Sequence, residues 1–236
     1  MAPMTQDTVR PAEPPAPVPT AARGGWSLVL PVKPLALAKS RLGPFAGARR
    51  PELALAFALD TVTAALACPL VGRVLVVTQD TCAARQLARL GAVVVDGEPD
   101  GGLNPALAHG AEYARRIAPR APLAVLSADL PALRPAELAR VLGAVPPAGR
   151  AFLADTPGIG TTLLACSPGA RLGPAFGGGS RARHAAGGAY EIGLPDVPSV
   201  RRDVDTGADL AEALALGVGP HTAAVSALVR PLGQRS

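Results

Sequence analysis

Two lysines, Lys33 and Lys39, stand out because every other strongly basic side chain of the 236-residue chain is an arginine. They follow an apolar run and lie six residues apart, with Arg41 close behind. A lysine ammonium is a compact charge on a flexible stem, so a pair of them suits a triphosphate or a leaving pyrophosphate. Backbone N–H groups in such a loop can add further donors. The pattern predicts a phosphate-binding loop over 33–41, although a solvated basic turn would carry the same charges.

Three aspartates are candidate ligands for a divalent metal ion. Asp129 follows the apolar segment 122–127, and a carboxylate at the end of a buried strand beside a phosphate loop is a common anchor for Mg²⁺. Asp203 and Asp205 are two residues apart, so both would point to one face of an extended segment and could complete this site or form a second one. The alternatives are a helix cap at Asp129 and a charged turn at the other two.

Two glycine-rich loops in the second half of the chain could bind an anion through their backbone. The segment 177–180 reads G-G-G-S, and the charges of Arg181 and Arg183 follow it. The segment 158–161, G-I-G-T, has a similar character. Two such loops indicate a small, doubly anionic substrate, although flexible surface loops would look alike. We expect His184 to be a helix-turn residue or a phosphate contact, because transfer to a phosphate oxygen needs little acid–base chemistry.

Alternating strands and helices must position these residues. In the first half, apolar runs and helical spacing predict strands and helices in turn, over 26–32, 51–67, 73–78, 81–90, 92–96, 106–117, 122–127 and 135–142. The second half is less regular, with strands over 151–154, 162–166 and 190–192 and a helix over 208–216. This alternation favours a three-layer, Rossmann-like α/β fold with a mostly parallel sheet. Ligands bind at the carboxyl ends of such strands, so the loops 33–41 and 97–104 and Asp129 should share one edge.

Composition also predicts the domain boundaries. Residues 1–25 are rich in Pro, Ala and Thr and lack an apolar signal core, which indicates a disordered leader. Residues 26–219 carry all the patterns above and should form one domain, a length that can bury a sizeable core. Residues 220–236 are expected to be a loosely held C-terminal tail.

Several classes of protein are excluded by composition and charge. The net charge of +5 comes from scattered arginines, and aromatic residues make up 3% of the chain, which argues against a nucleic-acid surface. No apolar run approaches the roughly 20 residues of a membrane span. Cys68, Cys82 and Cys166 are isolated, which argues against disulfides and structural zinc and indicates a reducing cytoplasm. The oligomeric state stays open, with a homodimer as one alternative.

The order of the motifs over about 26–219 resembles that of a known enzyme family. The motifs are P-V-K-x-x-x-x-A-K-S-R-L, A-D-L-P-A-L, G-x-G-T, F-G-x-x-S-x-x-R/H and D-V-D-T-x-x-D-L. They resemble the guanylyltransferases of deazaflavin coenzyme F-420 biosynthesis, which activate phosphoenolpyruvate or 2-phospho-L-lactate with GTP. That family is similar in fold to the nucleotide-diphospho-sugar transferases, whose fold is GT-A-like, including nucleotidyltransferases of the molybdenum cofactor.

The resemblance implies roles for individual residues. It implies a GTP site formed by Lys33, Lys39, Arg41 and Asn104. It implies a Mg²⁺ site formed by Asp129 and Asp205. It also implies a phosphoenolpyruvate site formed by Thr161, Gly177 and Ser180. Lys33, Lys39 and Arg41 would also be the catalytic residues, because they hold the triphosphate from which pyrophosphate leaves. One departure from the family pattern is the pair at 178–179, where a bulkier, partly acidic pair is expected in place of two glycines.

The reaction implied is condensation of phosphoenolpyruvate with GTP to give enolpyruvyl-2-diphospho-5′-guanosine and pyrophosphate. The nearest alternative is the same chemistry on 2-phospho-L-lactate, which carries the same phosphate beside a carboxylate. More distant alternatives are a molybdenum-cofactor or sugar-phosphate nucleotidyltransferase, or a glycosyltransferase of the same fold. A non-catalytic nucleotide-binding regulatory domain would be a further alternative. The short loops at Thr161 and 177–180 argue against a bulky acceptor.

Overall fold

The computed structural model describes residues 25–97, 99 and 101–229, so nearly all of the predicted leader lies outside the described residues. Its centre is a seven-stranded sheet with the strand order β3-β2-β1-β4-β6-β5-β7. The strands are β1 (Trp26–Pro31), β2 (Val71–Val77), β3 (Val93–Val95), β4 (Leu123–Leu126), β5 (Arg150–Ala154), β6 (Thr161–Cys166) and β7 (Tyr190–Glu191). The strands other than β7 are short and rich in Val, Leu and Ala, most of them buried, as in a sheet covered on both faces.

The sheet is mostly parallel, as the sequence predicts. Strands β1, β2, β3 and β4 pair in parallel, and β7 is parallel to β5. Only β6 runs against its neighbours β4 and β5 within the described sheet. This reversal brings the first residue of β6, Thr161, to the edge where β4 ends, and the N–H of Ser127 donates to the carbonyl of Thr162 at 2.8 Å.

Helices cover both faces of the sheet. The longer helices are α2 (Arg50–Leu66), α3 (Thr81–Arg89), α4 (Leu103–Ile117), α5 (Pro135–Gly143) and α8 (Gly207–Leu216). The shorter ones are η1 (Ser40–Leu42), α1 (Gly43–Ala46), η2 (Gly47–Arg49), α6 (Ser180–Ala186), α7 (Pro198–Arg201) and α9 (Pro220–Ser226). Most of the predicted helices appear within a few residues of their expected bounds, and His184, predicted as a helix-turn residue, lies in α6.

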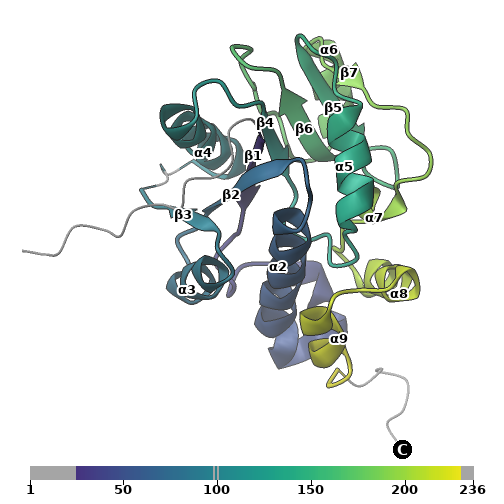
Figure 1. Ribbon diagram of the computed structural model, residues 1–236. Coiled ribbons are helices and arrows are strands. Elements are labelled where there is room, and N and C mark those ends of the chain that lie inside the picture. The colour runs from purple at the N-terminus through teal and green to yellow at the C-terminus, as the bar shows by residue number, and fades with distance from the viewer. Residues whose placement is uncertain (1–24, 98, 100, 230–236) are drawn as a thin grey trace, which may run out of the picture.

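Alternate residues of β1 face the two helical layers. Leu28 and Leu30 belong to one buried cluster together with side chains of α2, α3 and α5. Val29 belongs to a second cluster with side chains of α4. In Figure 1 the strands pass between α4 and α2, so the molecule has the three predicted layers. Because β1 lies near the middle of the sheet, the loop after it emerges at the centre of the sheet edge.

Residues 220–229 are not a loose tail, so that part of the prediction is wrong. They include α9, which packs beside α2 (Figure 1), and Thr222 is fully buried. The carboxylate of Asp60 accepts hydrogen bonds from the backbone N–H groups of His221 at 3.1 Å and Thr222 at 2.7 Å, which are free donors at the start of α9. Residues 230–236 lie outside the described residues. No helix in the described ranges is both long and apolar enough to cross a membrane.

Candidate active site

The loop after β1 holds its lysines in a defined conformation. Lys39 has φ 54° and ψ 43°, and it is the one non-glycine residue with a positive φ in the described part of the chain. A left-handed conformation costs an L-residue about 1–2 kcal/mol. The guanidinium of Arg50 donates to the carbonyl of Ala36 at 2.7 Å and also to that of Ala38. These contacts from α2 fix the loop that directs the side chain of Lys39.

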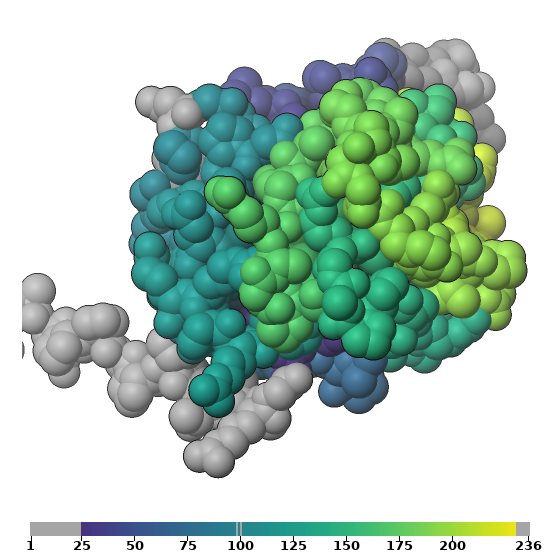
Figure 2. Space-filling model, turned by 90° about the horizontal axis from the view of Figure 1, so that it is seen from above, coloured from purple at the N-terminus to yellow at the C-terminus, as the bar shows by residue number. Residues whose placement is uncertain are grey.

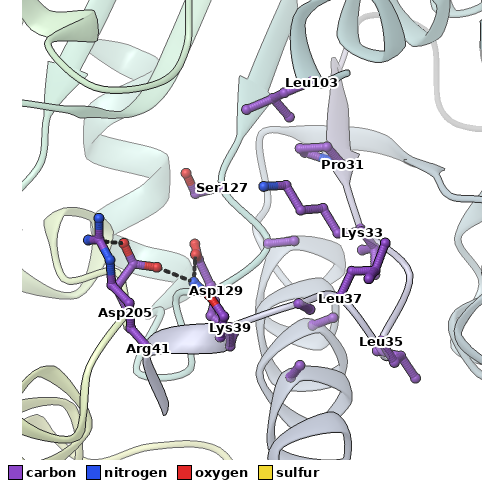
Figure 3. Close-up of a pocket in the computed structure, with 16 residues that line it drawn as sticks. Pro31, Lys33, Leu35, Leu37, Lys39, Arg41, Leu103, Ser127, Asp129 and Asp205 are labelled. Atoms are coloured by element: carbon purple, nitrogen blue, oxygen red, sulfur yellow. Dashed lines mark hydrogen bonds and ion pairs between the residues drawn. The ribbon is translucent and has the colours of Figure 1, made fainter. Parts of the chain in front are cut away.

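An ion cluster joins three distant segments of the chain. The ammonium of Lys39 contacts Asp129 Oδ2, which follows β4, and lies 2.7 Å from Asp205 Oδ1, which precedes α8. Arg41 Nη1 lies 3.9 Å from Asp205 Oδ2. Figure 3 shows the two carboxylates converging on the end of the Lys39 side chain. The residues that the sequence predicted for phosphate and metal binding are therefore in direct contact.

The cluster shifts the pKa values of its members. Burial alone would lower the pKa of Lys39, but the charges of Asp129 and Asp205 outweigh it and raise that pKa above its usual value. Burial would raise the pKa of Asp205, yet Lys39 and then Arg41 lower it. Burial raises the pKa of Asp203 to about 7, and the nearby charges of Asp129 and Asp205 act in the same direction. A third carboxyl group thus lies close to the pair, and a further positive charge there would favour its ionised form.

Lys33 and Lys39 line the same cavity, which has a volume of about 300 Å³. In Figure 3 the side chain of Lys33 extends into the space between Pro31, Leu103 and Ser127. No carboxylate of the described residues forms an ion pair with Lys33. Apolar side chains complete the wall, chiefly Leu35, Leu37, Ala54 and Ala58. The cavity therefore combines a lysine that has no ion-pair partner in the described ranges, a carboxylate pair and an apolar wall. This combination suits an elongated molecule with an anionic end.

The carboxylate pair fits a divalent cation. Asp129 Oδ1 is buried and has no hydrogen-bond partner among the described residues. Its other oxygen and Asp205 share the single ammonium of Lys39, so the protein itself places a positive charge between them. Two carboxylates are a sufficient protein contribution for Mg²⁺, which completes its shell with phosphate oxygens and water. Over 25–97, 99 and 101–229 no group of three or more His, Cys, Asp or Glu is arranged to hold a metal ion.

The predicted binding site for the second substrate is organised around a buried histidine. His184 is 1% exposed and both of its ring nitrogens have partners within the protein, which favours the helix-residue interpretation over a direct phosphate contact. Its Nδ1 lies 3.0 Å from the hydroxyl of Thr161, and its Nε2 accepts from the N–H of Ala175 at 3.1 Å. Gly177, with φ 114°, and Ser180 at the start of α6 follow Ala175 closely in the chain. Thr161, Gly177 and Ser180 do not line the 300 Å³ cavity.

Asn104 has a different environment from the one predicted. Its side-chain oxygen accepts from the N–H of Phe176 at 2.8 Å, and its nitrogen donates to the carbonyl of Phe176 at 3.1 Å. The neighbouring Leu103, not Asn104, lines the cavity. Figure 2 shows the teal segment around α4 directly beside the green segment that follows β6. The geometry therefore supports a loop-holding role for Asn104, and the nucleoside contact stays a prediction.

Sequence reasoning missed the apolar wall of the cavity and the contacts that hold its loops. Leu35 and Leu37 lie between the two lysines in the sequence, and this position is a signal that could have identified them. No pattern pointed to Arg50, which stands among several arginines, or to Phe176 as the partner of Asn104, 72 residues away. A pairing over such a distance leaves no trace in a local pattern.

Comparison with known proteins gives consistent matches. The profile of the MobA-like NTP transferase domain matches residues 55–186. A phosphoenolpyruvate guanylyltransferase of Streptomyces coelicolor is 64% identical over 89% of this chain and 99% of its own length. One of Thermomonospora curvata is 60% identical over 86% of this chain and 89% of its own length.

Solved structures agree on the fold. A nucleotidyl transferase from Methanothermobacter has a TM-score of 0.57 at 19% identity, covering 81% of this chain and 97% of its own. The protein Rv0371c of Mycobacterium tuberculosis has a TM-score of 0.53 at 20% identity, covering 81% of this chain and 98% of its own. The expected similarity to nucleotide-diphospho-sugar transferases is confirmed at the level of the fold.

Proposed function

Because the chain belongs to the phosphoenolpyruvate guanylyltransferases, within the MobA-like NTP transferases, we propose that it joins phosphoenolpyruvate to the guanylyl group of GTP. The products are enolpyruvyl-2-diphospho-5′-guanosine and pyrophosphate, an activation step of coenzyme F-420 biosynthesis. The observation that carries the proposal is the single cavity in which Lys33 and Lys39 meet Asp129 and Asp205. The free thiols of Cys68, Cys82 and Cys166 support a reducing cytoplasm as the place of action.

The reaction needs charge stabilisation more than proton transfer. A phosphate oxygen of phosphoenolpyruvate attacks the α-phosphorus of GTP, a new P–O bond forms, and the bond to the β-phosphate bridging oxygen breaks. Pyrophosphate leaves with that electron pair. The attacking oxygen is already ionised at neutral pH, so no general base is required. The protein must hold two anions close together and stabilise the charge that develops on the leaving group.

Lys33 and Lys39 supply this positive charge. Lys33 already extends into the cavity without a carboxylate partner among the described residues, and we assign it to the leaving phosphates. Lys39 keeps the facing carboxylates of Asp129 and Asp205 together until nucleotide and metal bind. Its flexible stem then allows the ammonium to contact the triphosphate. Arg41, whose side chain is 76% exposed, adds charge at the rim of the site.

Mg²⁺ is the divalent ion we propose, held by Asp129 and Asp205. The ion would neutralise charge on phosphate oxygens and so make the α-phosphorus more open to attack. Asp203 stands close enough to add negative potential to this pair, and burial, together with the charges of Asp129 and Asp205, raises its own pKa to about 7. The carboxylates therefore favour the ion most strongly when the ammonium of Lys39 has moved to the nucleotide.

The second substrate is assigned to Thr161, Gly177 and Ser180. Antiparallel pairing of β6 with β4 places Thr161 at the sheet edge that also carries Ser127 and Asp129. The left-handed φ of Gly177 allows a backbone turn that a side chain would strain. Phosphoenolpyruvate and 2-phospho-L-lactate share a phosphate beside a carboxylate, so both fit this donor set. The relatives named phosphoenolpyruvate guanylyltransferase favour the former.

A product assay tests the proposal. Purified protein is mixed with Mg²⁺ and GTP, phosphoenolpyruvate and 2-phospho-L-lactate are offered separately, and products are identified by mass spectrometry with pyrophosphate measured in parallel. We expect the enolpyruvyl product in the first reaction, and its loss when Mg²⁺ is chelated. Faster turnover of 2-phospho-L-lactate would assign the alternative substrate. No product with either acceptor would refute the assignment.

A further inference from the structure

The segment before Gly177 is held in an unusual way. Ala175 and Phe176 belong to no helix or strand, yet side chains bind all four of their backbone polar groups. The N–H of Ala175 donates to His184 Nε2 at 3.1 Å, and its carbonyl accepts from Arg183 Nε at 3.0 Å. Asn104 binds both polar groups of Phe176. A loop fixed at each of these points presents Gly177 and Ser180 in a preset arrangement, which lowers the entropy cost of binding a substrate.

The hydrogen bonds of His184 also determine whether the hydroxyl of Thr161 is a donor or an acceptor toward other groups. Because Nε2 accepts from the N–H of Ala175, it carries no proton. A neutral imidazole then has its proton on Nδ1, which donates to Thr161 Oγ1 across 3.0 Å. The hydroxyl of Thr161 therefore uses its oxygen as an acceptor toward His184 and keeps its own proton to donate elsewhere.

The surroundings of the ring keep it neutral. Burial, followed by the charges of Arg150 on β5 and Arg183 on its own helix, lowers the pKa of His184 to about 4. The ring of Phe176 packs against the imidazole edge at 5.1 Å between centroids, and that of Phe152 lies at 5.9 Å. At neutral pH the tautomer described above is thus the form present.

We propose that His184 is a positioning residue for the second substrate, which makes Thr161 an obligatory hydrogen-bond donor to the phosphoenolpyruvate anion and anchors the loop that carries Gly177. This inference rests on the proposed function. Thr161 lies at the sheet edge and keeps 7% exposure, and this role requires an anion to reach its hydroxyl at that edge. Without touching a substrate, His184 would in this way set the affinity for phosphoenolpyruvate and leave the affinity for GTP unchanged.

Two substitutions separate the two contacts of the ring. In His184→Asn the amide nitrogen can take the place of Nδ1 and still donate to Thr161, but nothing replaces Nε2. In His184→Gln the amide oxygen can take the place of Nε2 and still accept from Ala175, but the donor to Thr161 is lost. Thr161→Val removes the hydroxyl with little change of shape. The matched control is His221→Gln, because His221 is an exposed histidine in α9, far in the sequence from Thr161 and His184.

The test compares KM for phosphoenolpyruvate with KM for GTP. We expect Thr161→Val and His184→Gln to raise KM for phosphoenolpyruvate about tenfold, the size of one hydrogen bond to a charged group. KM for GTP should stay within about twofold in both, and His221→Gln should change neither. The double variant of Thr161→Val and His184→Gln should resemble the single variant Thr161→Val, because both changes remove the same contact. His184→Asn should keep most of the affinity for phosphoenolpyruvate.

Three results would overturn the inference. They are an equal rise of both KM values in His184→Gln, additive effects in the double variant, and unchanged KM for phosphoenolpyruvate in Thr161→Val. Should His184→Gln fail to fold, Thr161→Val and Thr161→Ser decide alone, since both leave the ring in place. The serine variant must then keep most of the affinity that the valine variant loses. A wild-type protein inactive on phosphoenolpyruvate refutes the proposed function, and the inference with it, whereas an active wild type with the results above refutes the inference alone.

Discussion

Replacing Lys39 by methionine tests whether its ammonium holds the carboxylates and also serves the reaction. Methionine keeps the length of the stem and removes the charge. The ammonium lies 2.7 Å from Asp205 and also contacts Asp129, so its loss leaves the two facing carboxylates with only weaker compensation, such as Arg41 at 3.9 Å from Asp205. The side chains of Asp129 and Asp205 are 24% and 50% exposed, so water screens them in part. We therefore expect a loss of about 1–2 kcal/mol in the free energy of unfolding, below the 3–5 of a fully buried pair.

The same substitution should change the response to metal. In the wild type a divalent ion must replace an ammonium that already neutralises the carboxylates, whereas in Lys39→Met it meets an unpaired site. Mg²⁺ without nucleotide should thus stabilise the variant more than the wild type, by up to about 2.7 kcal/mol at a concentration of 100 times Kd. The assay is urea unfolding of both proteins in Mg²⁺ and in a chelator. Turnover should fall by on the order of 10²- to 10³-fold, as when one charge donor to a transition state is removed.

Lys33→Met is the matched control for this experiment. It removes the other lysine of the cavity, whose ammonium has no carboxylate partner in the described part of the chain. It should lower turnover to a similar extent, with little loss of stability and no added response to Mg²⁺. The reasoning is refuted if Lys39→Met is as stable as the wild type in the chelator, or if Mg²⁺ stabilises all three proteins equally.

Three further predictions concern the backbone at Lys39, the pH dependence of stability and helix α9. Lys39→Gly should be more stable than Lys39→Ala by about 1 kcal/mol in urea unfolding, because glycine adopts the φ of 54° without strain. Equal stabilities of the two variants would contradict the left-handed conformation. The pKa of His184 is about 4 in the folded chain and 6.5 in the unfolded chain. Between these two pH values the unfolded chain binds more protons than the folded one, so the free energy of unfolding should fall by up to about 3 kcal/mol as pH drops from 6.5 to 4. His184→Asn should lose this share of the acid sensitivity, and an unchanged pH profile would contradict it. Asp60→Ala should cost about 1–3 kcal/mol and speed hydrogen exchange in α9, since the buried N–H of Thr222 and the partly buried N–H of His221 lose their acceptor. Unaltered exchange would mean that α9 is held by packing alone.

The sequence predicts the sheet and the cavity well because both follow local rules. Apolar runs separated by helical spacing indicate parallel strands, and parallel strands bring their carboxyl ends to one edge. Lys33, Lys39 and Asp129 each follow such a strand, so the sequence pattern alone predicts that they meet at that edge. The spacing of Asp203 and Asp205 allowed them to complete this site or to form a second one, because no strand directly precedes Asp205 to place it there. The resemblance then assigned Asp205 to the site of Asp129.

The contacts that fix the loops could not be predicted. Asn104 before a proline has the pattern of a helix start, and nothing local shows that its amide binds Phe176. Asp60 lies within the predicted helix 51–67, and its partners at 221–222 lie more than 160 residues further on. The loop before Thr161 gives no sign that β6 returns antiparallel to β4. Such pairings are decided by tertiary packing, in which each side satisfies the polar groups of the other.

A crystal structure of the protein with Mg²⁺ and a non-hydrolysable GTP analogue would show whether the cavity binds the triphosphate and the metal ion together. We expect triphosphate oxygens within hydrogen-bond distance of Lys33 and a metal ion held by Asp129 and Asp205. A triphosphate bound outside this cavity, or an ion without contact to Asp129, would contradict it.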